Sequence, residues 1–225
     1  MIGGFPHRPD TSFFHRAVKR LQEKSDFPIN SSVFTLGGFP ITRIPKHVRS
    51  KGLAGQPDIV VLQFGTSDLI VPLRKLHKQS KEQSARSVTV VDRVKWQVNG
   101  FLGEVLRRNS VTPPDVYRKT LLDVASTLRE HDVIPVILSP FVFGGSRSDR
   151  LARVNSNLLK KEIEALPDAL YVDAYSALAS HPRNRMLLGD GSHLSLEGHK
   201  VVADVLFPVL QFAVYRTKAM AEVFA

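Results

Sequence analysis

The feature that most constrains the fold is the run Asp58–Phe64, whose sequence is DIVVLQF. The run is mostly apolar and contains β-branched residues, as expected for a central strand of a parallel sheet that is covered on both faces. It ends at Gly65-Thr66-Ser67-Asp68, where a loop is expected to begin. Because such a strand needs helices on both sides of its sheet, the run predicts an α/β domain.

Short apolar runs alternate with helix-like patterns along the rest of the chain, which is typical of successive βα units. We predict five strands. The first ends at Gly3-Gly4, and the other four cover residues 32–36, 58–64, 133–138 and 170–172. Apolar spacing predicts helices near residues 14–21, 117–128, 151–166 and 196–209, with a shorter helix at 41–50. Asp10, Thr11 or Ser12 is expected to cap the first helix. The expected fold is one three-layer α/β/α domain over residues 1–225 around a central, mostly parallel five-stranded sheet.

Length and composition narrow the class of protein. A chain of 225 residues is long enough for one large domain, and its 43% hydrophobic residues are near the globular average. No apolar run approaches the roughly 18 residues of a membrane span, and no secretory leader is seen, so a cytoplasmic location is expected. Cysteine is absent, which excludes disulfides and thiolate chemistry. The irregular stretch 69–112 is expected to be an insertion that forms a lid or sets specificity.

The formal net charge of +10 predicts attraction to anionic partners such as acidic polysaccharide, a phospholipid surface or nucleic acid. The densest basic stretch is 74–86, where Glu82 is the single acid. A solvated face explains this stretch better than a binding patch, because it lacks aromatic residues that could stack on bases. We therefore do not predict binding to nucleic acid.

Ligands of an open parallel sheet bind at the carboxyl ends of its strands, where loops and helix N-termini converge. Four loops qualify: Gly3–Pro6, Gly37–Pro40, Gly65–Asp68 and Asp190–His193. In the last loop, a carboxylate beside an imidazole would fix its tautomer and stabilise its protonated form. The other histidines lack such a setting and are expected to be exposed or to cap helices. Since no histidine pair has the spacing and partners of a zinc site, we predict neither a metal nor a cofactor.

The sequence resembles the SGNH (GDSL-type) hydrolases, in which four short blocks supply Ser, Gly, Asn and His around one pocket. The clearest block is 188–199, LGDGSHLSLEGH, which is similar to the family's D-G-x-H-L-s-x-x-G and precedes the expected closing helix. The resemblance runs through nearly the whole chain and implies a flavodoxin-like fold. It also implies that His193 acts as general base and then general acid in an acyl-ester site, with Asp190 orienting its ring.

Two further blocks are matched in part. Residues 58–68 resemble the family's strand ending in G-x-N-D, but Ser67 stands where the family has the Asn that helps to bind the oxyanion. Gly65 and Asp68 would then stabilise this loop. Gly38 resembles the family's glycine, whose backbone N–H also faces the oxyanion. A serine hydroxyl donates one hydrogen bond but is shorter than an amide, so weaker oxyanion binding is expected.

The first block departs most from the family. Gly4 and Phe5 stand where the family has an aspartate and the nucleophilic serine, and phenylalanine cannot attack a carbonyl. Ser12 is a candidate nucleophile if the opening loop is longer than usual, although local side-chain chemistry favours a capping role for it. Ser67 is a weaker candidate.

Two classes of function follow. The first is an ester hydrolase or acyl transferase that acts on an O-acyl group of a carbohydrate or lipid, with Asp190 and His193 activating an unrecognised serine or water. The second is a catalytically impaired SGNH-like domain that binds an acylated or anionic ligand, with Phe5 as an apolar wall. The retained Asp190/His193 pair favours the first. A third hypothesis is polyanion binding through residues 74–86.

Overall fold

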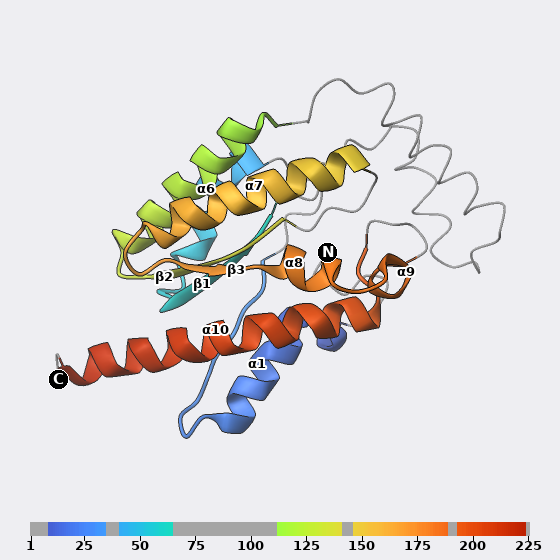
Figure 1. The fold of residues 1–225 in the computed structure, drawn as a ribbon. Coiled ribbons are helices and arrows are strands. Elements are labelled where there is room, and N and C mark those ends of the chain that lie inside the picture. Colours follow the sequence, from blue (N-terminus) through green and yellow to red (C-terminus); the bar gives the residue numbers. More distant parts are fainter. Residues whose placement is uncertain (1–8, 35–40, 65–111, 141–145, 189–192, 224–225) are drawn as a thin grey trace.

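The fold is seen in a computed structural model of the chain (Figure 1). It describes the following residues: 9–34, 41–64, 112–140, 146–188 and 193–223. The strand expected to end at Gly3-Gly4 and nearly all of the expected insertion at 69–112 lie outside the described residues.

The described residues contain a parallel sheet with strand order β1-β2-β3. Its strands are β1 (Ile59–Gln63), β2 (Ile134–Leu138) and β3 (Leu170–Val172). Ile59 pairs with Ile134, and Val136 pairs with Leu170. These strands confirm the α/β class and three of the predicted strand positions. Every residue of β2 is buried, whereas β1 is partly exposed, so β2 is the central strand of the described sheet.

The prediction of five strands is not met in the described part of the chain, which holds three. Residues 32–34 of the expected strand 32–36 form no strand. The side chain of Phe34 is 61% exposed and Ser32 is also exposed. An inner strand covered on both faces would bury these positions, so the short apolar pattern was misleading there.

Helices account for most of the remaining described residues. Their bounds are α1 (Phe13–Lys24), α2 (Ile44–His47), α6 (Pro114–Arg129), α7 (Ser146–Glu164), α8 (Ala174–Ala179), α9 (Arg183–Met186) and α10 (Leu196–Val223). Two 3-10 turns, η1 (Pro9–Thr11) and η2 (Ile41–Arg43), and one π-helical turn, η3 (Val48–Gly52), complete them. The short helix predicted at 41–50 is present as η2, α2 and η3. Pro45 is tolerated because it stands at the start of α2, where its missing N–H has no helical partner to lose.

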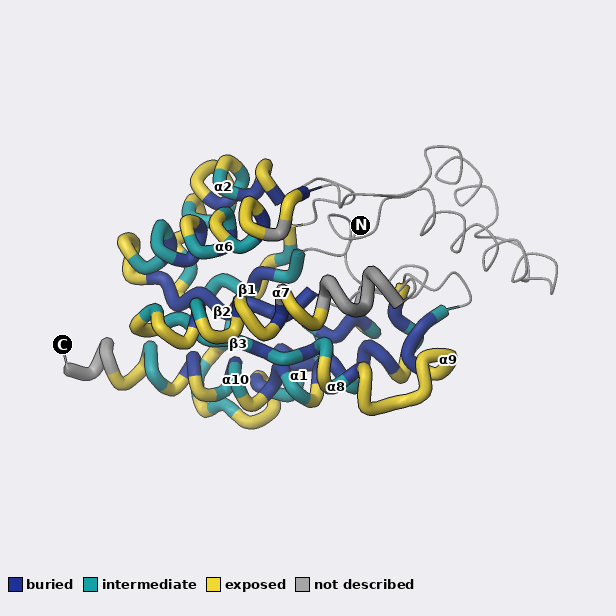
Figure 2. The backbone as a smooth tube through the Cα atoms, turned by 45° about the horizontal axis from the view of Figure 1, so that its top comes forward, coloured by how far each residue is buried: buried dark blue, intermediate teal, exposed yellow. Residues whose placement is uncertain are grey.

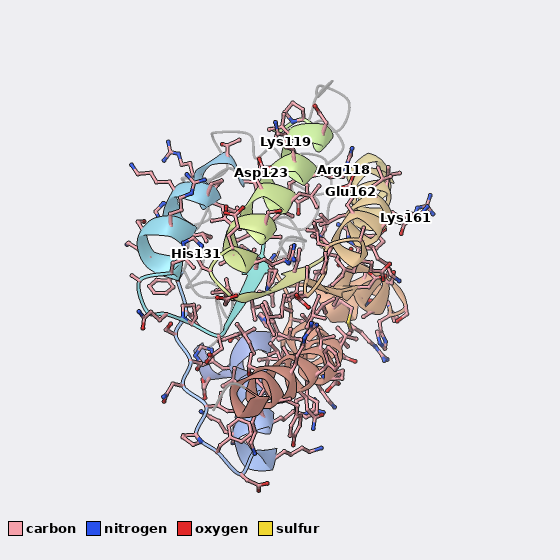
Figure 3. The ribbon with its side chains drawn as sticks, turned by 90° about the vertical axis from the view of Figure 1, so that its left-hand side faces the viewer. Arg118, Lys119, Asp123, His131, Lys161 and Glu162 are labelled. Atoms are coloured by element: carbon pink, nitrogen blue, oxygen red, sulfur yellow. The ribbon has the colours of Figure 1, made fainter. Side chains whose placement is uncertain are left out.

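The helices cover the sheet from two sides, α6 and α7 on one face and α1 and α10 on the other (Figure 1). Successive residues of β2 pack against opposite helix layers. Val136 belongs to the apolar cluster with α1 and α10, and Ile137 belongs to the cluster with α6 and α7. Figure 2 shows the buried positions concentrated along the sheet and the inner helix faces. Arg118 of α6 and Glu162 of α7 face each other, with 3.4 Å between Nε and Oε2 (Figure 3). The three-layer arrangement is therefore confirmed for the described residues.

Among the helices that the structure describes, none combines the length and the apolar character needed to cross a membrane.

Candidate functional site at the carboxyl edge of the sheet

The three strands end at one edge of the sheet, called here the carboxyl edge. Polar groups hold its backbone in place. The N–H of Ser139 donates to the carbonyl of Val172 at 2.9 Å, and the buried Ser139 hydroxyl accepts from the N–H of Tyr175 at 2.7 Å. The hydroxyl of Tyr117 donates to the carbonyl of Phe64 at 3.1 Å, directly after β1. The strand ends are therefore tied to α8 and α6.

His193 lies three residues before the first residue of α10 and is exposed. The chain on either side of it is closed by backbone contacts. The N–H of Leu188 donates to the carbonyl of His193 at 2.8 Å, and Leu187 forms an isolated antiparallel bridge with Leu194. These contacts join the residues on either side of 189–192, and His193 is the first described residue after that stretch.

The first turn of α10 is held against α9. The hydroxyl of Ser195 accepts from the N–H of Gly198 at 3.0 Å and donates to the carbonyl of Arg185. A Cβ added at Gly198 would lie 2.2 Å from the carbonyl oxygen of Met186. Glycine is required at this position because the two backbones approach so closely. The serine and glycine that follow His193 thus fix the direction in which α10 leaves the loop.

Ser12, the candidate nucleophile, is the N-cap of α1 and is 1% exposed. Its Oγ accepts from the N–H of His15 at 3.3 Å and lies 2.8 Å from Nδ1 of the same residue. The capping role expected for Ser12 is confirmed. Its role as nucleophile stays a prediction.

The remaining histidines were expected to be exposed or to cap helices, and His199, which is 3% exposed, is a buried capping residue. Its Nδ1 accepts from the N–H of Phe13 at 3.3 Å, and its ring stacks on the Phe13 ring with centroids 5.9 Å apart. Since Phe13 is the first residue of α1, His199 caps that helix from α10. This contact joins residues 186 positions apart, so local sequence patterns gave no signal of it. It brings Ser12 next to the first turns of α10.

A hydroxyl pair lies one residue before the end of β3, with Ser156 buried and Tyr171 partly buried. The Tyr171 hydroxyl of β3 donates to the carbonyl of Ser156 at 3.0 Å and lies 2.6 Å from the Ser156 hydroxyl. Burial raises the pKa of Tyr171 to about 12, so its phenol stays protonated at neutral pH. The pair therefore joins α7 to the sheet and supplies no base.

The other predicted site residues lie outside the described residues. They are Gly4, Phe5, Gly38, Gly65, Ser67, Asp68 and Asp190. The contact expected between Asp190 and His193 is thus still a prediction. Within the described ranges, no group of three or more His, Asp or Glu residues is arranged to hold a metal ion.

No protein-family model and no curated protein matches the sequence. Solved structures do match. Axe2, an acetylxylan esterase from Geobacillus stearothermophilus, is 17% identical with a TM-score of 0.58, over 88% of this chain and 80% of that one. A G-D-S-L family lipolytic protein from Desulfitobacterium hafniense is 14% identical with a TM-score of 0.59, over 92% and 93%. The chain therefore has the SGNH (GDSL-type) hydrolase fold.

Catalytic mutants of Axe2, in which a serine, an aspartate or a histidine is replaced by alanine, are among the matching structures, at TM-scores of 0.60 to 0.61. In that protein the aspartate and the histidine are three positions apart.

Proposed function

We propose that this chain is a carboxylic ester hydrolase or acyl transferase that acts on an O-acyl group, with His193 and Asp190 as its acid–base pair. The observation that carries the proposal is the exposed His193, which lies three residues before α10 in a chain with the SGNH fold. An exposed imidazole can be reached by a substrate, and imidazole is the side chain most often used for general acid–base catalysis.

Two observations support Asp190 as the partner of His193. Leu188 and His193, which flank residues 189–192 in the sequence, are joined by a backbone hydrogen bond, so only a short stretch of chain separates Asp190 from His193. The spacing from Asp190 to His193 also equals the spacing of the aspartate and histidine whose replacement gives catalytic mutants of Axe2. A carboxylate in this position orients the ring and stabilises its protonated form during the reaction.

In the proposed reaction His193 takes a proton from the attacking hydroxyl group or water, whose oxygen forms a bond to the acyl carbon. The ester C–O bond then breaks, and the imidazolium returns the proton to the leaving alcohol oxygen. The backbone N–H of Gly38 and the hydroxyl of Ser67 would bind the oxyanion. Loss of one such donor typically costs about 3 kcal/mol of transition-state stabilisation. In this proposal Gly4 lines the same pocket, Phe5 forms its apolar wall, and Gly65 and Asp68 hold the loop that carries Ser67.

The attacking group is the open part of the mechanism. Ser12 is 1% exposed and its hydroxyl caps α1, which favours a structural role. For the hydrolase we therefore assign the attack to water, activated directly by His193; for the acyl transferase the attacking group is the hydroxyl of the acceptor. A fluorophosphonate probe tests this assignment, because labelling of Ser12 would show an accessible nucleophilic serine instead.

A second candidate function is a binding domain for an acylated or anionic ligand. The capping role of Ser12, together with Phe5 at the position of the family's serine, favours it. It predicts saturable binding of an acylated ligand without turnover or probe labelling.

Hydrolysis of p-nitrophenyl acetate separates the two functions. His193→Ala should lower kcat/KM by at least about 100-fold, because general acid–base catalysis contributes 100-fold to 10,000-fold. The matched control is His181→Ala, which removes an exposed imidazole between α8 and α9. Wild-type activity in His193→Ala, or equal losses in both variants, would rule out the proposed mechanism.

A further inference from the structure

The chain between Asp26 and Asp58 contains no aspartate or glutamate, yet it carries Arg43, Lys46, Arg49 and Lys51. These four cations lie on η2, α2 and η3, the consecutive helical turns that follow one another beside α6. They are named the basic surface below. Positive charge without interspersed acids produces a field that attracts polyanions.

The packing of these turns directs the four cations into solvent. Ile41, Ile44 and Val48 are buried in the cluster that includes α6. Every member of the basic surface is exposed. Figure 2 shows α2 on the outside of the α6 layer, with exposed positions along its outer side. The apolar side of the segment is thus buried in the core, and the charged side is exposed and accessible to a binding partner.

Several cations elsewhere in the described chain have acidic partners. They include the pairs Lys19–Glu23, Arg20–Asp204, Arg118–Glu162, Lys160–Glu164 and Arg216–Asp168. Lys46, Arg49 and Lys51 form no ion pair with any residue that the structure describes. In this they differ from Lys19, Arg20, Lys160 and Arg216, whose charges are partly neutralised by a neighbouring carboxylate.

An open, shallow hollow of about 570 Å³ lies at the end of the basic surface. It is lined by Arg49, Leu53, Ala54, Thr127, Glu130 and His131. His131 lies at the C-terminal end of α6, and its Nδ1–H donates to the carbonyl of Thr127 at 2.9 Å (Figure 3). Its Nε2 is left to hydrogen-bond a ligand. Arg49 adds positive charge, and Glu130 adds an acceptor for hydroxyl groups.

These features favour one class of polyanion. Insertion into a lipid surface needs exposed apolar side chains, and those of this segment are buried. Stacking on the bases of single-stranded nucleic acid needs aromatic side chains, and residues 41–57 contain no Phe, Tyr or Trp. A polysaccharide with carboxylate groups needs neither feature: its charges match the cations, and its hydroxyl groups match the polar lining of the hollow.

We infer that the basic surface binds an anionic, carboxylate-bearing polysaccharide and that the substrate of the ester site is an O-acylated polymer of this class. The second part rests on the proposed function. In Figure 1 the segment runs behind α6 from the end of that helix nearest the carboxyl edge toward its opposite end. A polymer held along the segment would therefore reach the carboxyl edge of the sheet from the side of α6.

The experiment measures binding of fluorescein-labelled polygalacturonate, which carries no acyl ester, with labelled dextran as the uncharged polymer. Lys46→Glu/Arg49→Glu should weaken binding to polygalacturonate by about tenfold or more, since each reversal replaces an attraction by a repulsion. The matched control Lys161→Glu/Lys200→Glu makes the same charge change on α7 and α10, and should leave binding nearly unchanged. Lys161 projects from α7 on the side away from α2 (Figure 3). Thermal unfolding of both variants checks that each is folded.

Equal weakening in the two double variants would overturn the inference, because net charge would then explain the binding. Tighter binding of duplex DNA than of polygalacturonate at equal salt would overturn it in favour of nucleic acid. Hydrolysis of p-nitrophenyl acetate keeps the two proposals apart: Lys46→Glu/Arg49→Glu should retain wild-type turnover of this small uncharged ester. If the wild type binds polygalacturonate as expected but hydrolyses no ester, the ester proposal fails while the binding surface stands.

Discussion

At the scale of a residue, Gly198 lies where the backbones of α9 and α10 are too close for a side chain to fit between them. Gly198→Ala would place a Cβ 2.2 Å from the Met186 carbonyl oxygen and 3.1 Å from Cδ2 of Leu194. We expect the variant to lose about 1–3 kcal/mol of unfolding free energy, although alanine is the better helix former. Urea denaturation measures this loss. Because α10 would shift at its first turn, we also expect ester turnover by His193 to fall.

Gly55→Ala is the matched control for this prediction. A Cβ added at Gly55 meets no atom within 4 Å. Its unfolding free energy should equal that of the wild type within about 0.5 kcal/mol. Equal stability of Gly198→Ala and the wild type would mean that α9 and the start of α10 are not packed as closely as described.

At the scale of an element, α1 has an N-terminus capped by Ser12 from its own chain segment and by His199 from α10. Ser12→Ala should cost about 1 kcal/mol of unfolding free energy, the usual effect of losing a cap. Ser50→Ala, an exposed serine in η3, should cost much less. Esterase activity distinguishes a capping role of Ser12 from a nucleophilic one. If Ser12 only caps α1, the Ser12→Ala protein keeps wild-type esterase activity at temperatures below its unfolding temperature. Abolished turnover in a folded Ser12→Ala protein would identify it as the nucleophile.

Elements with a long apolar stripe were predictable from sequence. Helix α1 buries Ala17, Val18 and Leu21, which were part of the stripe that predicts it. The short helices α8 and α9 were missed because four to six residues are too few to establish a helical period. The cap of α8 is nevertheless local, since Asp173 accepts from the N–H of Ser176 at 3.0 Å. Attention to Asp173 as an N-cap could have found it.

The candidate site was predictable only where its chemistry is local in sequence. The motif around His193 indicated a loop histidine shortly before a helix, and the structure places an exposed His193 three residues before α10, while its pairing with Asp190 stays a prediction. The capping role of His199 depends on a contact between α10 and α1, so periodicity alone could not reveal it. The fold of the basic surface was partly predicted as a helix at 41–50. Its exposure follows from packing against α6, which becomes visible only in three dimensions.

At the scale of the whole molecule, the hydroxyl pair of Tyr171 and Ser156 joins the α7 layer to β3, and its burial links global stability to pH. The pKa of Tyr171 is raised from 10.0 to about 12, mainly by desolvation. Below pH 10 the phenol is protonated in both the folded and the unfolded chain, so its contribution is constant. Between pH 10 and about 12 the unfolded chain releases this proton first, and the folded state loses stability as the pH rises.

A shift of this size corresponds to about 2–3 kcal/mol of unfolding free energy, lost across that pH interval. Tyr171→Phe removes the phenol while keeping the ring, so the fall in stability between pH 10 and 12 should become shallower by this amount. Urea denaturation at several pH values compares the two slopes. Lysines also lose their protons in this interval, but they do so in both proteins, and the difference between the slopes isolates Tyr171. Identical slopes would show that the phenol is not buried between α7 and the sheet.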